Sequence, residues 1–180
     1  RGHEVIAIGR SAGNLPSGEG IEVRVSDVSD VSALAEAVAG AEAAISALTF
    51  NVTANTILEG LKKAGINRLI VTGGAASLHL PDGTRIFDMP GYPDAVKRMV
   101  LPGIHHFDWL KLEKELNWSF FSPGRQLFEG PRLGKFRLDT ETVILDDAGE
   151  SRISYADAAI AMVDELEQNN HPQGRWTASY

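Results

Sequence analysis

Hydrophobic positions follow two alternating patterns along the chain. Short runs rich in β-branched residues are typical of buried strands, and longer runs with apolar residues three or four apart are typical of helices. The two patterns alternate at least four times. This alternation predicts βα units around a mostly parallel sheet, with helices on its faces.

The strands are expected at 5–8, 22–25, 43–48, 68–72, 118–121 and 176–178. The helices are expected at 32–39, 53–64, 105–116 and 155–167. Asp30 and Ser154 are suited to cap the first and the last of these helices. Gly40 and Gly65 are suited to end the first two. We expect the strands near Val5, Val23, Ala43, Leu69 and Trp118 to run parallel, because each is followed by a connection long enough for a crossover.

Residues 75–103 contain four prolines and no sustained hydrophobic period. We predict an irregular loop at the carboxyl edge of the sheet, and long loops there are often binding loops or lids. A hairpin-like segment is expected at 135–138 and 142–145, with a turn at 147–149.

Composition narrows the class of protein. A chain of 180 residues predicts one domain, and a net charge of -7 with scattered basic residues gives no footprint for nucleic acid or an anionic membrane. There is no cysteine, which excludes cysteine catalysis and fits a reducing cytoplasm. No apolar run reaches the roughly 20 residues of a membrane span. We therefore expect a cytoplasmic protein with a small-molecule partner, as a monomer or a homodimer.

Several segments resemble one known family in order and spacing. They are "RGHEVIAIGRS", "VSDVSD", "AAISAL", "RLIVTGGAASL", "LNWSFFSPG", "RISYADAAIAMVDELE" and "GRWTASY". The family is the NADH-flavin reductase branch of the NmrA-like atypical short-chain dehydrogenases, with mammalian biliverdin reductase B as a more distant relative. The resemblance covers essentially the whole chain. It implies a single Rossmann-type, doubly wound α/β domain that binds NAD(P)H.

The chain departs from that family at its beginning. Rossmann domains of this kind open with a strand, a Gly-x-x-Gly-x-x-Gly turn that receives the pyrophosphate, and a helix. None of these precedes the strand at Val5, and Arg1 to His3 resembles the last turn of such a helix. We therefore expect the first βα unit, about 25 to 30 residues, to be missing through truncation.

The adenosine side of the cofactor site is expected after the first two strands. Arg10 stands where an arginine favours the 2′-phosphate of NADP and an acid would favour NAD, with Ser11 beside it. This favours NADP, although Arg10 could also be a solvated surface residue. Asp27 and Val28 resemble the family's adenine-side pair, although Asp27 could simply be a turn residue.

The nicotinamide side is expected at the carboxyl ends of later strands, where ligands bind in open α/β sheets. Small residues or glycines there would let a cofactor approach closely, although they could equally serve tight turns. The expected cofactor contacts are Ala47, Leu48, Thr49, Gly73, Gly74, Ala75, Pro123 and Gly124. The last two belong to a segment that, in the resembling family, runs beside the nicotinamide.

No tyrosine and lysine stand one helical turn apart, as the acid–base pair of the wider superfamily does. Tyr92 and Lys97 are five residues apart in the proline-broken region. His105 and His106 are the remaining proton donors to consider, although paired histidines at a helix start are more often structural. A conjugated acceptor can take hydride without a strong general acid, whereas an alcohol–carbonyl interconversion normally needs one.

We therefore predict an NAD(P)H-dependent reductase of flavin-like or quinone-like acceptors. The alternative is a non-catalytic NADP-binding redox sensor of the NmrA type. A sugar-nucleotide epimerase is disfavoured, because little chain follows Trp118 for a substrate domain. Phe87 and Tyr92, in the 75–103 loop, are predicted to form an acceptor-side wall. The competing interpretation is that they pack over a helix or join a subunit interface.

Overall fold

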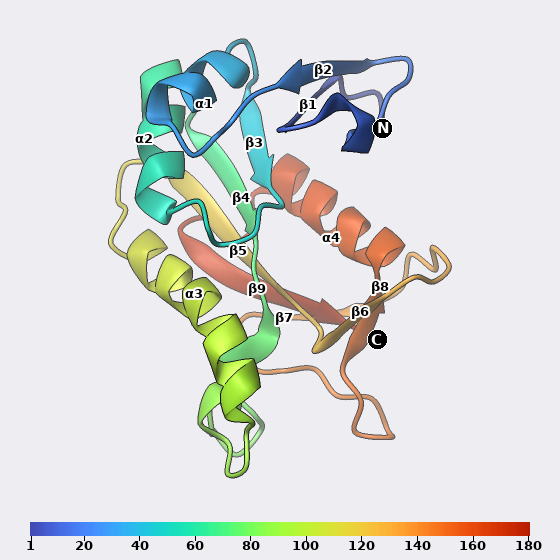
Figure 1. Ribbon diagram of the computed structural model, residues 1–180. Helices are drawn as coiled ribbons and strands as arrows, with labels where there is room; N and C mark the ends of the chain where they lie inside the picture. The colour runs from blue at the N-terminus through green and yellow to red at the C-terminus, as the bar shows by residue number, and fades with distance from the viewer.

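A computed structural model describes residues 1–180 as nine strands, four α-helices and three short 3-10 helices. The strands are β1 (Val5–Gly9), β2 (Ile21–Val25), β3 (Ala43–Ser46), β4 (Arg68–Thr72), β5 (Asn117–Pro123), β6 (Gln126–Phe128), β7 (Arg137–Asp139), β8 (Arg152–Ser154) and β9 (Gly174–Ser179). The α-helices are α1 (Val31–Ala37), α2 (Ala54–Ala64), α3 (Asp94–Leu110) and α4 (Tyr155–Gln168). The 3-10 helices are η1 (Ala12–Asn14), η2 (Ala75–Ser77) and η3 (Ile86–Asp88). The fold is the mostly parallel α/β arrangement that the alternating pattern predicts (Figure 1).

The main sheet has five strands in the order β3-β4-β5-β9-β7. Its first four strands are parallel, and β7 is antiparallel to β9. Two further pairs, β1 with β2 and β6 with β8, are also parallel. The parallel order predicted for the five strands from Val5 to Trp118 is therefore confirmed within each sheet.

The sheet is nevertheless divided between β1 and β3. Strand β1 is hydrogen-bonded only to β2, and β3 only to β4, so each has one unpaired backbone edge. Val5 on β1 is 45% exposed, and Ile45 on β3 is 42% exposed. Such exposure is unusual for β-branched residues of a parallel sheet, whose strands are normally buried. The two sheets are held together by side chains instead.

Helices cover both faces of the main sheet (Figure 1). Residues of α1, α2 and α3 pack with Leu69, Trp118 and Phe120 in a cluster of 15 buried residues. On the opposite face, α4 packs on Phe121 and Trp176 in a second cluster of seven. The carboxyl ends of β3 and β4 therefore lie beside the packed layer of α1, α2 and α3, and each leads into a loop.

Three of the predicted helix caps are confirmed, whereas Gly40 does not cap α1, which ends at Ala37 with Val38 as its C-cap. The side chain of Asp30 accepts a hydrogen bond from the backbone N–H of Ala33 at 2.8 Å, and Ser154 accepts one from Asp157 at 3.1 Å. Gly65 ends α2 in the left-handed conformation, with φ of 76°. These local signals were reliable because each depends only on residues within one helical turn.

Two predictions were wrong. The helix expected at 105–116 begins at Asp94 and ends at Leu110, so the second half of the expected 75–103 loop is largely helical despite Pro102. A proline inside a helix removes one hydrogen bond, a cost that tertiary packing of α3 offsets. The expected hairpin does not form either, because β7 pairs with β9 and residues 142–145 make no strand. Among the helices, none is both long and apolar enough for a membrane crossing.

Candidate functional site

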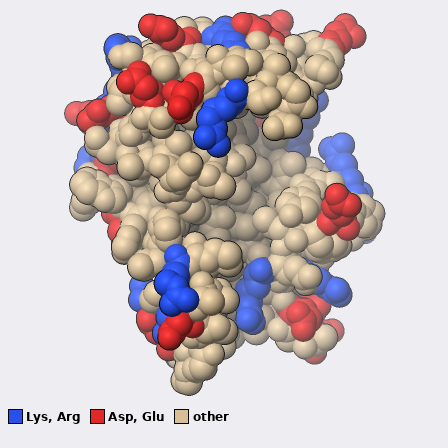
Figure 2. Space-filling view, in the orientation of Figure 1, with Lys and Arg blue, Asp and Glu red and all other residues tan.

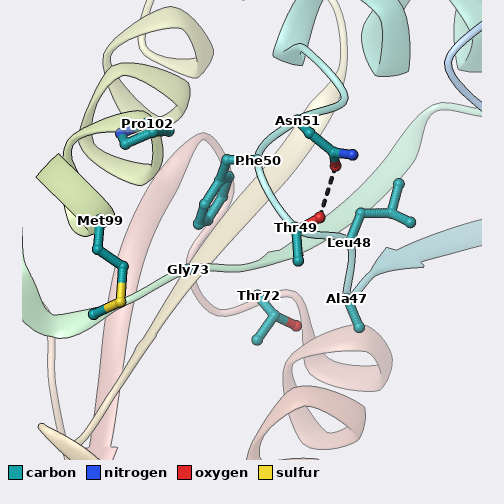
Figure 3. Close-up of a pocket in the computed structure, with 9 residues that line it drawn as sticks. All are labelled: Ala47, Leu48, Thr49, Phe50, Asn51, Thr72, Gly73, Met99 and Pro102. Atoms are coloured by element: carbon teal, nitrogen blue, oxygen red, sulfur yellow. Dashed lines mark hydrogen bonds between the residues drawn. The ribbon is translucent and has the colours of Figure 1, made fainter.

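A cavity of about 590 Å³ opens at the carboxyl ends of β3 and β4 (Figure 3). This volume lies within the range of about 300 to 1,000 Å³ that is typical of small-molecule sites. Its lining residues come from the loop after β3, the end of β4 and one side of α3. They are Ala47, Leu48, Thr49, Phe50, Asn51, Thr72, Gly73, Met99 and Pro102.

The floor of the cavity depends on a glycine. The backbone N–H of Gly73 donates to the carbonyl of Phe121 at 2.7 Å, which extends the β4–β5 pairing by one residue. A Cβ on Gly73 would overlap with the ring of Phe120, so no larger residue fits without moving the core. The floor is therefore bare backbone, which a flat ligand can approach closely.

The wall on the α3 side contains Phe50, which is held from behind. A Cβ on Gly103 would lie 2.8 Å from the Phe50 ring, so the glycine leaves room for that ring against the helix. The rings of Phe50 and His106 lie 5.2 Å apart and are tilted by 58°. Met99, which is 72% exposed, stands at the mouth of the cavity beside Pro102 (Figure 3).

The polar groups of the cavity are neutral. Thr49 Oγ1 donates to Asn51 Oδ1 at 2.7 Å, and Asn51 Nδ2 has no hydrogen-bond partner in the protein (Figure 3). None of the nine lining residues carries a charge. In Figure 2 the same face of the molecule is hollowed near its middle, and the charged side chains lie mostly around the rim.

The structure brings four of the predicted nicotinamide-side residues together. Ala47, Leu48, Thr49 and Gly73 all line the cavity. Gly74 follows directly, and a Cβ there would meet open space. The remaining predicted residues lie outside the lining: Arg10, Ser11, Asp27, Val28, Ala75, Phe87, Tyr92, His105, His106, Pro123 and Gly124.

The residues expected near the adenosine differ in what they can offer. Arg10 is exposed directly after β1. Asp27 Oδ1 accepts from the hydroxyl of Ser29 at 2.7 Å and from its N–H at 3.1 Å. These bonds, together with nearby Arg10, lower the pKa of Asp27. Val28 is 8% exposed and belongs to the core, so it offers little surface to a ligand.

Pro123 and Gly124 are buried at the end of β5. The N–H of Gly124 donates to the carbonyl of Ala178 at 3.0 Å. A Cβ on Gly124 would lie 3.0 Å from the backbone nitrogen of Arg152, so close packing against β8 accounts for the glycine.

Phe87 and Tyr92 contact each other rather than the cavity, with ring centroids 6.3 Å apart. Arg85 and Lys97 lie over the Phe87 ring at 5.2 and 5.6 Å from its centroid. The other apolar residues of this loop pack as a small cluster of their own around Leu78, Ile86 and Val143. This arrangement corresponds to the packing interpretation of the loop.

The two histidines lie in the last turns of α3 rather than at a helix start. His105 is exposed, whereas His106 is only 5% exposed. Burial lowers the pKa of His106 to about 4, and its Nε2 has no partner. His106 is therefore neutral at physiological pH, and it stands behind Phe50 rather than in the cavity.

Sequence reasoning missed five lining residues: Phe50, Asn51, Thr72, Met99 and Pro102. Phe50 and Asn51 directly follow the predicted strand-end residues, so extending that segment by two positions would have found them. Met99 and Pro102 had no such signal, because the prolines around them argued against a helix.

Comparisons with known proteins agree with this geometry. A family model described as NAD(P)H-binding matches residues 1–169. The uncharacterized protein YwnB of Bacillus subtilis is 32% identical over 189 residues, covering 98% of this chain and 87% of YwnB.

Two solved structures are similar over nearly the whole chain. One, a candidate epimerase from Bacteroides thetaiotaomicron, is 38% identical with a TM-score of 0.91. The match covers 98% of this chain and 85% of the epimerase chain. The other, a candidate NADH-flavin reductase from Streptococcus pneumoniae, is 30% identical with a TM-score of 0.84. The match covers 99% of this chain and 88% of the reductase chain. With its Rossmann-type sheet and the family match over residues 1–169, the chain belongs to the NAD(P)H-binding family, in agreement with its resemblance to the NmrA-like atypical short-chain dehydrogenases.

Proposed function

We propose that this protein is an NADPH-dependent reductase that transfers hydride to a flavin-like or quinone-like acceptor. The observation that carries the proposal is the uncharged cavity at the carboxyl ends of β3 and β4, in a chain of the NAD(P)H-binding family. Ligands of open α/β sheets bind at this edge. The Streptococcus pneumoniae relative described as a candidate NADH-flavin reductase supports the same class of acceptor.

The residues around the cavity fit the nicotinamide half of the cofactor. Ala47 has only a methyl group and Gly73 has no side chain, so a ring can lie close to both strand ends. A bound reduced nicotinamide supplies a hydride to an acceptor held against its ring. The protein's part is to hold the two rings in contact and to exclude water from between them.

The lack of a placed acid favours a conjugated acceptor. No lining residue titrates near neutral pH, and His106 behind Phe50 is neutral because burial lowers its pKa to about 4. A flavin or quinone that has accepted a hydride can take the one remaining proton from water, whereas reduction of a simple ketone normally needs a positioned acid. Positioning in this cavity is therefore enough for the proposed reaction.

The test is steady-state oxidation of NADPH, followed at 340 nm, with riboflavin or menadione as the acceptor. We expect turnover that saturates with both substrates. Tight NADPH binding without turnover on either acceptor would contradict the reductase and favour a redox sensor. Turnover of simple ketones at a comparable rate would contradict the choice of acceptor.

A further inference from the structure

We infer that Phe50 and Asn51 form the acceptor subsite of this cavity, which takes a neutral planar ring bearing a carbonyl group. In this arrangement the ring stacks on Phe50, and its carbonyl accepts a hydrogen bond from Asn51 Nδ2. The inference rests on the proposed function for the identity of the reaction. Its evidence is the construction of the α3 side of the cavity (Figure 3).

Phe50 is fixed in place by two features of α3. The missing side chain at Gly103 provides the space that the ring occupies, since a Cβ there would come within 2.8 Å of the Phe50 Cε2 atom. The buried ring of His106 packs against Phe50 at 5.2 Å. An aromatic ring held from behind keeps one face for stacking at little entropic cost on binding.

A hydrogen bond from Thr49 orients the side-chain amide of Asn51. Its Oδ1 accepts the Thr49 hydroxyl at 2.7 Å, so the amide oxygen is engaged and the Nδ2 group lies on the other side of the carboxamide (Figure 3). Nδ2 makes no hydrogen bond within the protein and can donate to a ligand. The carboxamide therefore presents donors, which match the carbonyl oxygens of quinones and flavins.

The electrostatics select a neutral ring. All nine lining residues are uncharged, and Met99 and Pro102 add apolar surface opposite the strand ends. An anionic or cationic ring would lose hydration without gaining a charged partner. A neutral conjugated ring loses little hydration and gains contact with Phe50 and Met99.

The stacking part is tested by calorimetric titration of menadione into the 180-residue protein without cofactor. We expect Phe50→Leu to weaken menadione binding about three- to tenfold, the loss expected for one aromatic contact. Gly103→Ala should weaken it similarly, because the new methyl group pushes the ring into the cavity. Gly13→Ala is the control, since a Cβ at Gly13 meets nothing within 4 Å.

The double variant Phe50→Leu/Gly103→Ala shows whether the helix acts through the ring. If it does, Gly103→Ala has a smaller effect on the menadione Kd when Phe50→Leu is already present than in the wild type. An equal effect in both backgrounds would overturn the role assigned to Gly103. Retained melting temperatures verify that each variant folds.

The hydrogen-bond part is tested with a pair of ligands, menadione and 2-methylnaphthalene, which has a similar shape but no carbonyl. The wild type should bind menadione about three- to tenfold tighter, and Asn51→Leu should remove this preference. Thr49→Val should reduce the preference, and Thr49→Ser, which keeps the hydroxyl, should restore it. Asn55→Leu is the matched control, since the Asn55 side chain bonds Glu59 on α2 outside the cavity.

Three results would overturn the inference. Equal binding of the two ligands to the wild type would remove the carbonyl contact. An unchanged preference in Asn51→Leu would remove Asn51 as the donor. If Phe50→Leu and Asn51→Leu weakened NADPH binding as much as they weaken menadione binding, the cavity wall would serve the cofactor instead. Because these titrations need no turnover, an enzyme that binds menadione through Asn51 but oxidises no NADPH would refute only the proposed function.

Discussion

Arg10 is the residue that we propose selects between the two nicotinamide cofactors. It is exposed after β1, close enough to Asp27 to lower the pKa of that carboxyl group, and free to meet a 2′-phosphate. We predict that Arg10→Glu weakens NADPH binding about tenfold to a hundredfold and NADH binding much less, because it replaces a phosphate partner with a repelling charge.

Fluorescence titration with both cofactors measures the two affinities. Lys135→Glu is the control for the change in net charge, because Lys135 is exposed and its side chain makes no hydrogen bond or ion pair. Equal losses of NADPH and NADH affinity in Arg10→Glu would show that Arg10 does not select the cofactor.

His106 gives the protein a specific sensitivity to acid. Its pKa is about 4 in the folded protein, because of burial, against an ordinary value of 6.5. Between these values the unfolded chain binds the proton more readily, so the free energy of unfolding falls as the pH falls. The largest slope that one such group can produce is about 1.4 kcal/mol per pH unit.

We predict that the free energy of unfolding falls from pH 7 to pH 5 by about 1 to 2 kcal/mol less in His106→Leu than in the wild type. Urea unfolding at the two pH values measures this difference. His105→Leu is the control, because His105 is the neighbouring histidine of α3 and its side chain is exposed. Parallel losses of stability in the wild type and His106→Leu would refute the assignment.

At the residue scale, the sequence located the residues at strand ends, but it did not show which of them line the cavity. Ala47 and Gly73 were predicted at strand ends and do line the cavity, because a strand end is a local property. Gly124 and Val28 follow strands in the same way, but their neighbours in the fold bury them. Burial depends on contacts that are distant in sequence, and no local pattern reveals it.

At the scale of elements, the segment from η2 to the start of α3 is a small packed unit. Its apolar side chains form a cluster around Leu78, Ile86 and Val143, and Tyr92 packs against that cluster. Arg85 and Lys97 lie over the Phe87 ring, and Tyr92 lies beside it. The segment thus stabilises its own conformation, and its aromatic rings lie outside the cavity lining.

We predict that Phe87→Ala with Tyr92→Ala lowers the melting temperature and leaves the KM for flavin unchanged per folded molecule. The reason is that the rings contribute packing rather than acceptor contact. Thermal unfolding and flavin kinetics measure the two effects. A severalfold rise in KM at an unchanged melting temperature would restore the wall that the sequence suggested.

The elements that the sequence predicted well are those with strong local signals. Strand β4 and helix α4 were found almost to the residue, from a continuous apolar run and from the Ser154 cap. The start of α3 was missed because Pro93 and Pro102 argue for a loop, although tertiary packing holds the helix. Strands β6 and β8 have only three residues each, too few for a periodic signal.

At the scale of the whole molecule, residues 1–25 are joined to the rest mainly by side chains. Arg1 contacts Asp164 at 2.5 Å and Glu167 at 2.6 Å, and His3 contacts Glu167 at 2.8 Å. These pairs are partly exposed and contribute little individually. No ladder of hydrogen bonds connects β1 to β3.

For the 180-residue chain, in which β1 pairs only with β2, we predict that backbone amides of β1 and β2 exchange with deuterium faster than those of β4 and β5. The β1–β2 pair can open without breaking the main sheet, so its opening costs less free energy. Hydrogen exchange followed by mass spectrometry resolves the two regions. Equal protection would show that the β1–β2 pair unfolds only together with the main sheet.

The open edges of β1 and β3 also determine how concentrated solutions of these 180 residues should behave. An unpaired edge flanked by exposed β-branched side chains is a template for strands of neighbouring molecules. The net charge of -7 opposes such contacts at low ionic strength. Salt shortens the range of that repulsion to about 8 Å at physiological strength. We therefore expect added salt to favour β-mediated association of these 180 residues, and dilute low-salt buffers to limit it.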